Sequence, residues 1–314
     1  MLKQTGTIIA VLGVAFNLAL AAPAESTTKP AGEYQIKLHR PETVGSRYQY
    51  SVTGSAKKDT TMSVAGQAVP TPSEVMAFEV SGIKEVTKVD KQGRPTGITF
   101  TIAKCVQVEG DKKTEVAPKG TVVLATYEND HKNITAKDAS VTLSDEALQI
   151  LHLVIDVSTA KEGEGDDDDS FGTKDKKKVG DTWPVHADAV VKQMGSQIGQ
   201  GATLHKDDVT GQTKLAAVKT VQGVDCLEVQ CNMTISNFKP PVPPLLGDIK
   251  VTSGKIAVAL TGLFPVDLVS QPVNSTQSET MTFEMTGTNG KNPISIKVNA
   301  TSVLSITETK IAKD

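Results

Sequence analysis

The segment Leu143–Val185, LSDEALQILHLVIDVSTAKEGEGDDDDSFGTKDKKKVGDTWPV, separates two β-rich parts of the chain. It begins with a helix signal. Ser144 suits an N-cap, and Asp145 and Glu146 place negative charge in the first turn, where the helix dipole favours it. An apolar face then recurs at helical spacing in Leu148, Leu151 and Ile155. We therefore predict one short helix at the start of this segment.

Acidic and then basic side chains follow the predicted helix. Asp166–Asp169 come first, and Lys174 and Lys176–Lys178 come after them. Such a sequence has little apolar surface to bury, so we expect residues 161–178 to form a disordered, charged loop. The four aspartates could gather a calcium ion. The run lacks the alternating ligands and terminal glutamate of an EF-hand, however, and a flexible loop is the preferred interpretation.

An ordered strand is predicted to restart at Val179-Gly180-Asp181-Thr182-Trp183, around the single tryptophan. A similar run, Val44–Tyr50, opens the first β-rich part. Each run is followed at near-equal spacing by a loop and an alternating strand, which indicates a degenerate internal duplication. Because β-proteins reuse valine, glycine and aromatic residues, chance similarity remains the alternative.

The predicted fold class is mainly β: two related halves of curved antiparallel sheet, half-barrel or sandwich-like, with one short helix between them. The first half comprises residues 43–160 and the second half residues 179–314. The last strand has the clearest alternation, and its inward face carries Ile294, Ile296, Val298, Ala300, Leu304 and Ile306. A strand of this length should curve.

Glycine and proline mark three interruptions of this pattern. Residues 90–97 predict a hairpin loop, and a change of phase from Val80 to Ile83 indicates a β-bulge at Gly82. Phe238–Gly247 contains four prolines and cannot be a central strand, so a stiff extended loop is expected there.

The N-terminal residues predict export. Lys3, an apolar run and Ala19-Leu20-Ala21 indicate a signal peptide over residues 1–21, and residues 22–42 are expected to be a flexible leader. No later apolar run is long enough to predict a transmembrane anchor after cleavage. The net charge of −3 gives no support for a nucleic-acid partner. Partners are otherwise unknown, with lipid or an envelope protein as the options considered.

Cysteine and histidine provide no recognisable site. Cys226 and Cys231 would lie about 16 Å apart on opposite faces of one strand, too far to bridge, whereas pairing of either with Cys105 stays open. His186 and Asp188 could share a strand face, but two ligands are too few for a metal site. His152 is interpreted as a core residue of the predicted helix. We thus predict no catalytic, cofactor-binding or metal-binding residues.

The predicted helix, the acidic run ending at Phe171-Gly172 and the Val179–Trp183 strand start together resemble a family of uncharacterised exported bacterial β-rich proteins. In that family a helix and a loop precede a Val-Gly-Asp-Ser/Thr-Trp strand start. The resemblance implies no activity and no catalytic residues. The architecture is also similar to periplasmic lipoprotein carriers, in which a curved sheet holds acyl chains.

The function predicted from these observations is that of an exported, soluble, non-catalytic β-protein with a structural or interaction role in the envelope. The first alternative is a carrier or sensor of an apolar ligand such as a lipid, which the long apolar strand face would hold. The second alternative is a hydrolase whose site residues converge only in three dimensions.

Overall fold

The computed structural model describes residues 32–159, 165–197, 204–239, 249–289 and 292–312. It is mainly β, with 59% of residues in strands and 10% in helices, which confirms the predicted class. The predicted signal peptide, residues 22–31 of the expected leader and residues 240–248 of the proline-rich segment lie outside the described residues. Among the described residues, no helix has both the length and the apolar character needed to cross a membrane.

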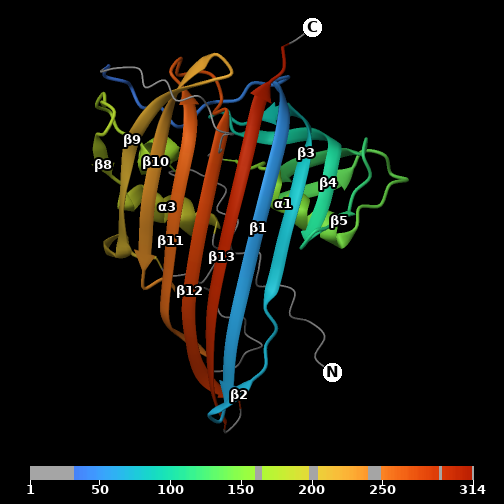
Figure 1. Cartoon of the computed structure of the whole chain (residues 1–314), viewed down its shortest axis with the longest axis vertical. Helices are drawn as coiled ribbons and strands as arrows, with labels where there is room; N and C mark the ends of the chain where they lie inside the picture. Colours follow the sequence, from blue (N-terminus) through green and yellow to red (C-terminus); the bar gives the residue numbers. More distant parts are fainter. Residues whose placement is uncertain (1–31, 160–164, 198–203, 240–248, 290–291, 313–314) are drawn as a thin grey trace.

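One antiparallel sheet of 13 strands dominates the molecule (Figure 1). Its strands are β1 (Arg47–Val64), β2 (Gln67–Val69), β3 (Glu74–Val89), β4 (Pro95–Glu109), β5 (Lys112–Glu115), β6 (Val122–Glu128), β7 (His131–Ala136), β8 (Thr182–Pro184), β9 (Val209–Val221), β10 (Val224–Ser236), β11 (Lys250–Pro265), β12 (Asn274–Asn289) and β13 (Asn292–Lys310).

The chain runs from the centre of the sheet to one edge and returns from the other edge. The strand order is β7-β6-β4-β3-β1-β13-β12-β11-β10-β9-β8, with β2 and β5 paired to β1 and β4. The two predicted halves are therefore the two sides of a single sheet, which does not close. Its edge strands, β7 and β8, are consecutive in sequence, and residues 137–181 connect them.

The two similar runs of the sequence begin strands in different places. Val44–Tyr50 leads into β1 at the centre, whereas Val179–Trp183 leads into β8 at an edge. Their glycines do share a local feature: Gly45 and Gly180 have φ angles of 83° and 99°, a region that favours glycine. The duplication stays a prediction.

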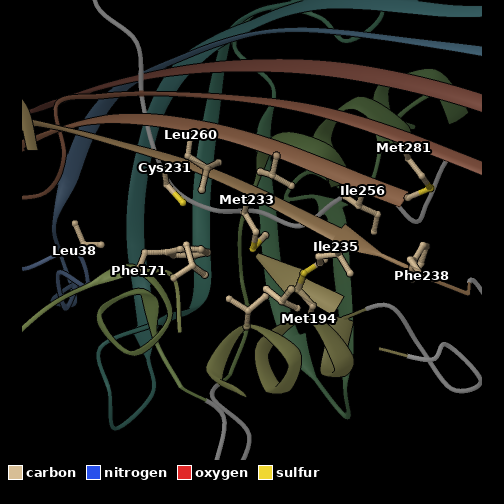
Figure 2. Close-up of a cluster of buried hydrophobic side chains, with 14 of the residues drawn as sticks. Leu38, Phe171, Met194, Cys231, Met233, Ile235, Phe238, Ile256, Leu260 and Met281 are labelled. Atoms are coloured by element: carbon tan, nitrogen blue, oxygen red, sulfur yellow. The ribbon is translucent and has the colours of Figure 1, made fainter. Parts of the chain in front are cut away.

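Two buried clusters fill the concave side of the sheet. The first-half core combines side chains of β3 and β4, such as Val80 and Phe100, with helix α1 (Asp145–Val154). The second-half core combines β9–β13 with Val190 and Met194 of helix α3 (Ala187–Gln197). Figure 2 shows Met194 close to the side chains of β10. Both helices lie behind the sheet in Figure 1, against its outer strands.

Helix α1 confirms the predicted helix. The Ser144 hydroxyl accepts a hydrogen bond from the Ala147 amide at 3.1 Å, as an N-cap should. Its buried face consists of Ala147, Ile150, Leu151 and Val154. This places His152 on the exposed side, so its interpretation as a core residue was wrong.

The expectation of disorder across the acidic run was also wrong for the described part, residues 165–178. Asp167–Phe171 forms helix α2, because Asp166 and Asp169 cap each other's backbone amides in a capping box. Ser170 and Phe171 are buried at its end. The structure thus adds α2 and α3 to the single helix expected.

The Val179–Trp183 strand start is fixed by contacts to α2. Trp183 is buried in β8, and its indole N–H donates to the Phe171 carbonyl at 2.7 Å. The neighbouring His186 amide donates to the Ser170 carbonyl at 3.0 Å. These bonds hold the end of the acidic run against the tryptophan.

Residues 32–42, named the strap here, are not a flexible leader. They cross one end of the sheet and bury Ile36, Leu38, Arg40 and Glu42. Tyr34 and Lys177 exchange two backbone hydrogen bonds of 2.8 Å, and the Leu38 amide donates to Asp168. Since the acidic run supplies this partner, the two segments expected to be disordered order each other.

Three smaller expectations are resolved. The hairpin loop between β3 and β4 is present, and the pairing is irregular at Gly82. The extra residue is Ala103 of β4, however, so the inward face of β3 continues from Val80 to Lys84. The three cysteines are free and buried, and burial raises the pKa of each thiol to about 11.

The ordered state of the acidic run can be tested with Phe171→Ala. Loss of this buried ring should lower the free energy of unfolding by about 3–5 kcal/mol. Urea titration followed by Trp183 fluorescence measures the change. Lys174→Ala, an exposed change in the same run, should stay within about 0.5 kcal/mol. If both substitutions change the free energy of unfolding by the same near-zero amount, the acidic run is disordered, as the sequence predicted.

Candidate functional site

A cavity of about 450 Å³ lies where both sides of the sheet meet the connection between them. Its wall combines the strap, the β3–β4 loop, the end of α1, the start of α2 and the last residues of β13. Its size is in the range of ligand pockets, but ten of its 28 lining residues are charged, unlike the mostly apolar lining of typical pockets.

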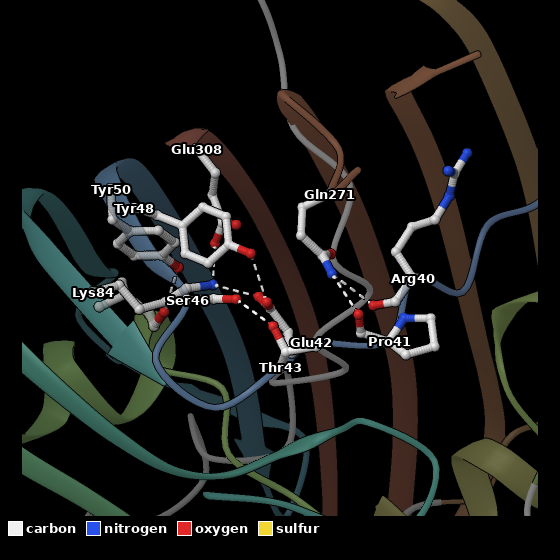
Figure 3. A network of polar contacts seen from close by, with 11 residues as sticks. Arg40, Pro41, Glu42, Thr43, Ser46, Tyr48, Tyr50, Lys84, Gln271 and Glu308 are labelled. Atoms are coloured by element: carbon white, nitrogen blue, oxygen red, sulfur yellow. Dashed lines mark hydrogen bonds and ion pairs between the residues drawn. The ribbon is translucent and has the colours of Figure 1, made fainter. Parts of the chain in front are cut away.

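A buried network at Lys84 forms one side of this cavity (Figure 3). The Lys84 ammonium lies 2.6 Å from Glu308 Oε1 and 3.6 Å from Glu42 Oε1. The side chains of Lys84 and Glu42 are only 13% and 7% exposed. Lys84 also lies over the rings of Tyr48 and Tyr50, 4.7 and 5.5 Å from their centroids. Three other segments, the strap, β1 and β13, thus converge on this cation of β3.

Burial and charge pairing compete at these groups. Burial by itself lowers the pKa of Lys84, but the carboxylates of Glu308 and Glu42 together outweigh it and raise that pKa. Burial raises the pKa of Glu42, against the opposing effects of Lys84 and of the Tyr48 hydroxyl, which donates to Glu42 at 2.6 Å. Burial and Glu42 raise the pKa of Tyr48. The lysine therefore stays charged inside the fold.

The strap is fastened on both sides of the network. The Glu42 amide donates to the Gly93 carbonyl at 2.8 Å, which joins the strap to the β3–β4 loop. On the other side, the Arg40 guanidinium donates to the Pro265 carbonyl of β11 at 3.0 Å, and Gln271 donates to the Arg40 carbonyl at 2.7 Å. The strap therefore links the two halves and forms part of the cavity wall.

The opposite wall comes from the connection between the edge strands. The Lys132 ammonium donates to the carbonyls of His152 and Ile155, at 2.9 and 2.8 Å, and so caps the end of α1 with positive charge. Burial lowers the pKa of Lys132 and raises that of Asp167, whose carboxylate accepts from Gln193 at 3.1 Å.

Both signs of charge therefore face the cavity. The basic residues of its wall are Arg40, Lys84, Arg94 and Lys132, and the acidic ones are Glu42, Asp130, Asp156, Asp166, Asp167 and Glu308. His39 also lines it, but its ring contacts the Gln92 carbonyl at 3.0 Å. The wall thus offers hydrogen bonds and charge to a ligand.

The residues considered from sequence do not form a site of their own. His186 precedes α3 and Asp188 lies within it, and the two point to different partners, the Gly172 carbonyl and Lys206. The aspartates of the acidic run bind the chain itself, through the capping box, the strap and Gln193. Within the part of the chain that the structure describes, no group of three or more metal-ligating side chains occurs.

Sequence reasoning missed Lys84 and Glu308, although a signal was available. Lys84 occupies an inward position of β3, between Val80 and Val86, and Glu308 follows Ile306 on the inward face of β13. A charged residue on the apolar phase of an alternating strand indicates a buried partner. The partner itself could not be found from periodicity.

Comparisons with known proteins assign this chain to no family. No protein-family model and no curated protein matches this chain. One similar solved structure is the TodX monoaromatic hydrocarbon channel deltaS2 mutant, at 8% identity over 86% of this chain and 91% of that chain. Its TM-score is 0.15, and so low a likeness carries no argument about fold or function.

The network predicts a large effect of Lys84→Met on stability. The substitution leaves Glu42 and Glu308 buried without their cation, so the free energy of unfolding should fall by roughly 3–5 kcal/mol. Chemical denaturation at neutral pH measures the loss. Adding Glu308→Gln to this variant should recover part of it, because one of the two uncompensated charges is removed.

Lys88→Met is the matched control. Lys88 lies on the same strand, but its ion pair with Glu128 is solvent-exposed on both sides. Its loss should cost less than about 1 kcal/mol. A Lys84→Met variant no less stable than Lys88→Met would mean that the network does not fasten the strap.

Proposed function

We propose that this chain is an exported, non-catalytic interaction protein of the cell envelope, which binds a small polar ligand in the cavity beneath the strap. The observation that carries the proposal is the cavity of about 450 Å³ with charged groups of both signs on its wall. A hydrophilic molecule with its own charges or hydrogen-bonding groups fits such a wall, because a polar ligand that leaves water must regain hydrogen bonds from the groups around it.

A binding role is favoured over a hydrolase by the way the charged groups are used. Lys84 and Glu42 are held in ion pairs or hydrogen bonds within the fold, and Lys132 caps a helix. A general acid or base must instead reach a substrate proton, at about 2.6–3.2 Å. Groups fixed in this way suit recognition, where preorganised polar side chains reduce the cost of ordering on binding.

The proposed place of action rests on the N-terminal sequence. Residues 1–21 have the charged start, the apolar run and the small-residue cleavage site of a signal peptide. The resemblance to exported bacterial β-rich proteins supports the same placement. The cavity's partner would then be a solute or an envelope component outside the cytoplasm.

Blocking the cavity tests this function. Ser158 lines the wall, and Ser158→Phe would place a ring in the space. We expect native mass spectrometry to show that the purified protein retains one class of small solute from a panel of amino acids, sugars, nucleotides and polyamines. Ser158→Phe should bind that class at least tenfold more weakly, since the ring occupies the ligand's volume.

Thr282→Phe serves as the control, because Thr282 lies on the convex face of β12, away from the cavity. This variant should bind like the wild type. Failure of the wild-type protein to retain any class of solute, or equal binding by Ser158→Phe, would contradict the proposed function.

A further inference from the structure

The concave face of β12 carries three buried polar side chains, Ser275, Gln277 and Glu279, beside an apolar row. Every second residue of this strand points inward, and the second part of the row, Met281, Phe283 and Met285, belongs to the second-half core. Gln277 and Glu279 precede them on the same face and are only 6% and 3% exposed. Hydrophobic alternation would place valine or leucine here.

Neither side chain is satisfied by the fold. Among the described residues, Gln277 Oε1 and Glu279 Oε2 are buried without a hydrogen-bond partner. Burial raises the pKa of Glu279 to about 8, with no compensating charge. An unmade hydrogen bond of a buried group costs free energy, so two of them on adjacent inward positions weaken the fold. Each such group needs an explanation, and a bound ligand that supplies the missing hydrogen-bond donors is one.

The cross-strand neighbours define what else a ligand would touch. Glu279 pairs with Val258 of β11 on one side and with Ser302 of β13 on the other. Gln277 pairs in the same way with Leu260 and Leu304. On the β13 side, Ser302 is in turn paired with Ala56 of β1, and the side chains of both residues are small. An apolar wall therefore borders the two acceptors on the β11 side, with small residues beyond Glu279 on the β13 side.

The position also lies between the two hydrophobic cores. Val258 and Leu260 belong to the second-half core, whereas Leu304 packs against the first-half core. Among the strands, helices α1 and α3 contact chiefly β7 and β9, far from the β12–β13–β1 centre. The two helices therefore pack on either side of the β12–β13–β1 centre.

We propose that Gln277 and Glu279 mark a binding site for an amphipathic molecule. The apolar body of this molecule lies along Val258 and Leu260. Its amine or hydroxyl group donates hydrogen bonds to the two side-chain oxygens that have no partner in the fold. Gln277 and Glu279 do not line the polar cavity beneath the strap, although Ser275, the preceding inward residue of β12, does. The inference therefore goes beyond the proposed function. An amine and a hydroxyl share the required chemistry, a hydrogen-bond donor at the end of an apolar chain.

Removal of the carboxyl distinguishes a ligand site from a structural group. In Glu279→Leu the orphan oxygen is gone, so the Tm of the free protein should rise by roughly 2 °C or more. Calorimetric titration should show that decylamine or 1-decanol binds this variant at least about tenfold more weakly than the wild type. A structural role would give the opposite sign of the Tm change.

Two further variants complete the test. Glu284→Leu changes the same residue type on the exposed face of β12 and should leave binding by decylamine and 1-decanol unchanged. Glu279→Gln keeps the shape and one acceptor but cannot ionise. Loss of decylamine binding alone in this variant assigns the site to ammonium groups, and retention of both probes assigns it to neutral donors.

The proposal is overturned if the wild-type protein binds neither probe, if Glu279→Leu binds both as well as the wild type does, or if Glu279→Leu lowers the Tm. Ser158→Phe also tests whether the two sites are independent, because it blocks the polar cavity, whose lining includes neither Gln277 nor Glu279. Binding of decylamine or 1-decanol by Ser158→Phe at wild-type strength would show that the two sites are independent.

Discussion

The antiparallel pairing of β1 with β13 is the interaction on which the rest of the structure depends. It runs without interruption from Tyr48 opposite Lys310 to Val64 opposite Ile294, and so joins the two ends of the folded chain at the centre of the sheet. Without it, the two meanders would be separate sheets with four edges, and edges are sites of unpaired backbone groups. The pairing closes a loop that contains most of the chain, but the entropic cost of closing a loop grows only slowly with its length.

The register of that pairing also builds the polar network. Tyr50 lies opposite Glu308 on one side of β1, and Tyr48 lies opposite Lys84 on the other side. A slip by one residue would turn Glu308 to the convex face and leave Lys84 without its nearest carboxylate. The strap then adds Glu42 from a segment that is not part of the sheet. Sheet register and strap position are therefore coupled through one lysine.

Four polar residues occupy inward positions of the strands at and beside the centre of the sheet. Lys84, Glu308, Gln277 and Glu279 all occupy inward positions near the seam where the two halves meet. The outer strands instead pack helices α1 and α3 against ordinary apolar side chains. A seam lined by polar groups keeps the two hydrophobic cores apart. The molecule can thus hold a polar cavity and an amphipathic site without interrupting either core.

Local sequence determined the elements that depend on periodicity and capping. The alternation of β13, the hairpin after β3 and the helix begun by Ser144 could all be predicted, because neighbouring residues alone decide them. Only the tertiary structure decided that Phe171 and the strap would be ordered, since each needs a partner distant in sequence. The same holds for Lys84 and Glu279. Whether a charge on an inward face is paired depends on its cross-strand neighbours. The sequence of one strand does not determine which strands lie beside it in the sheet.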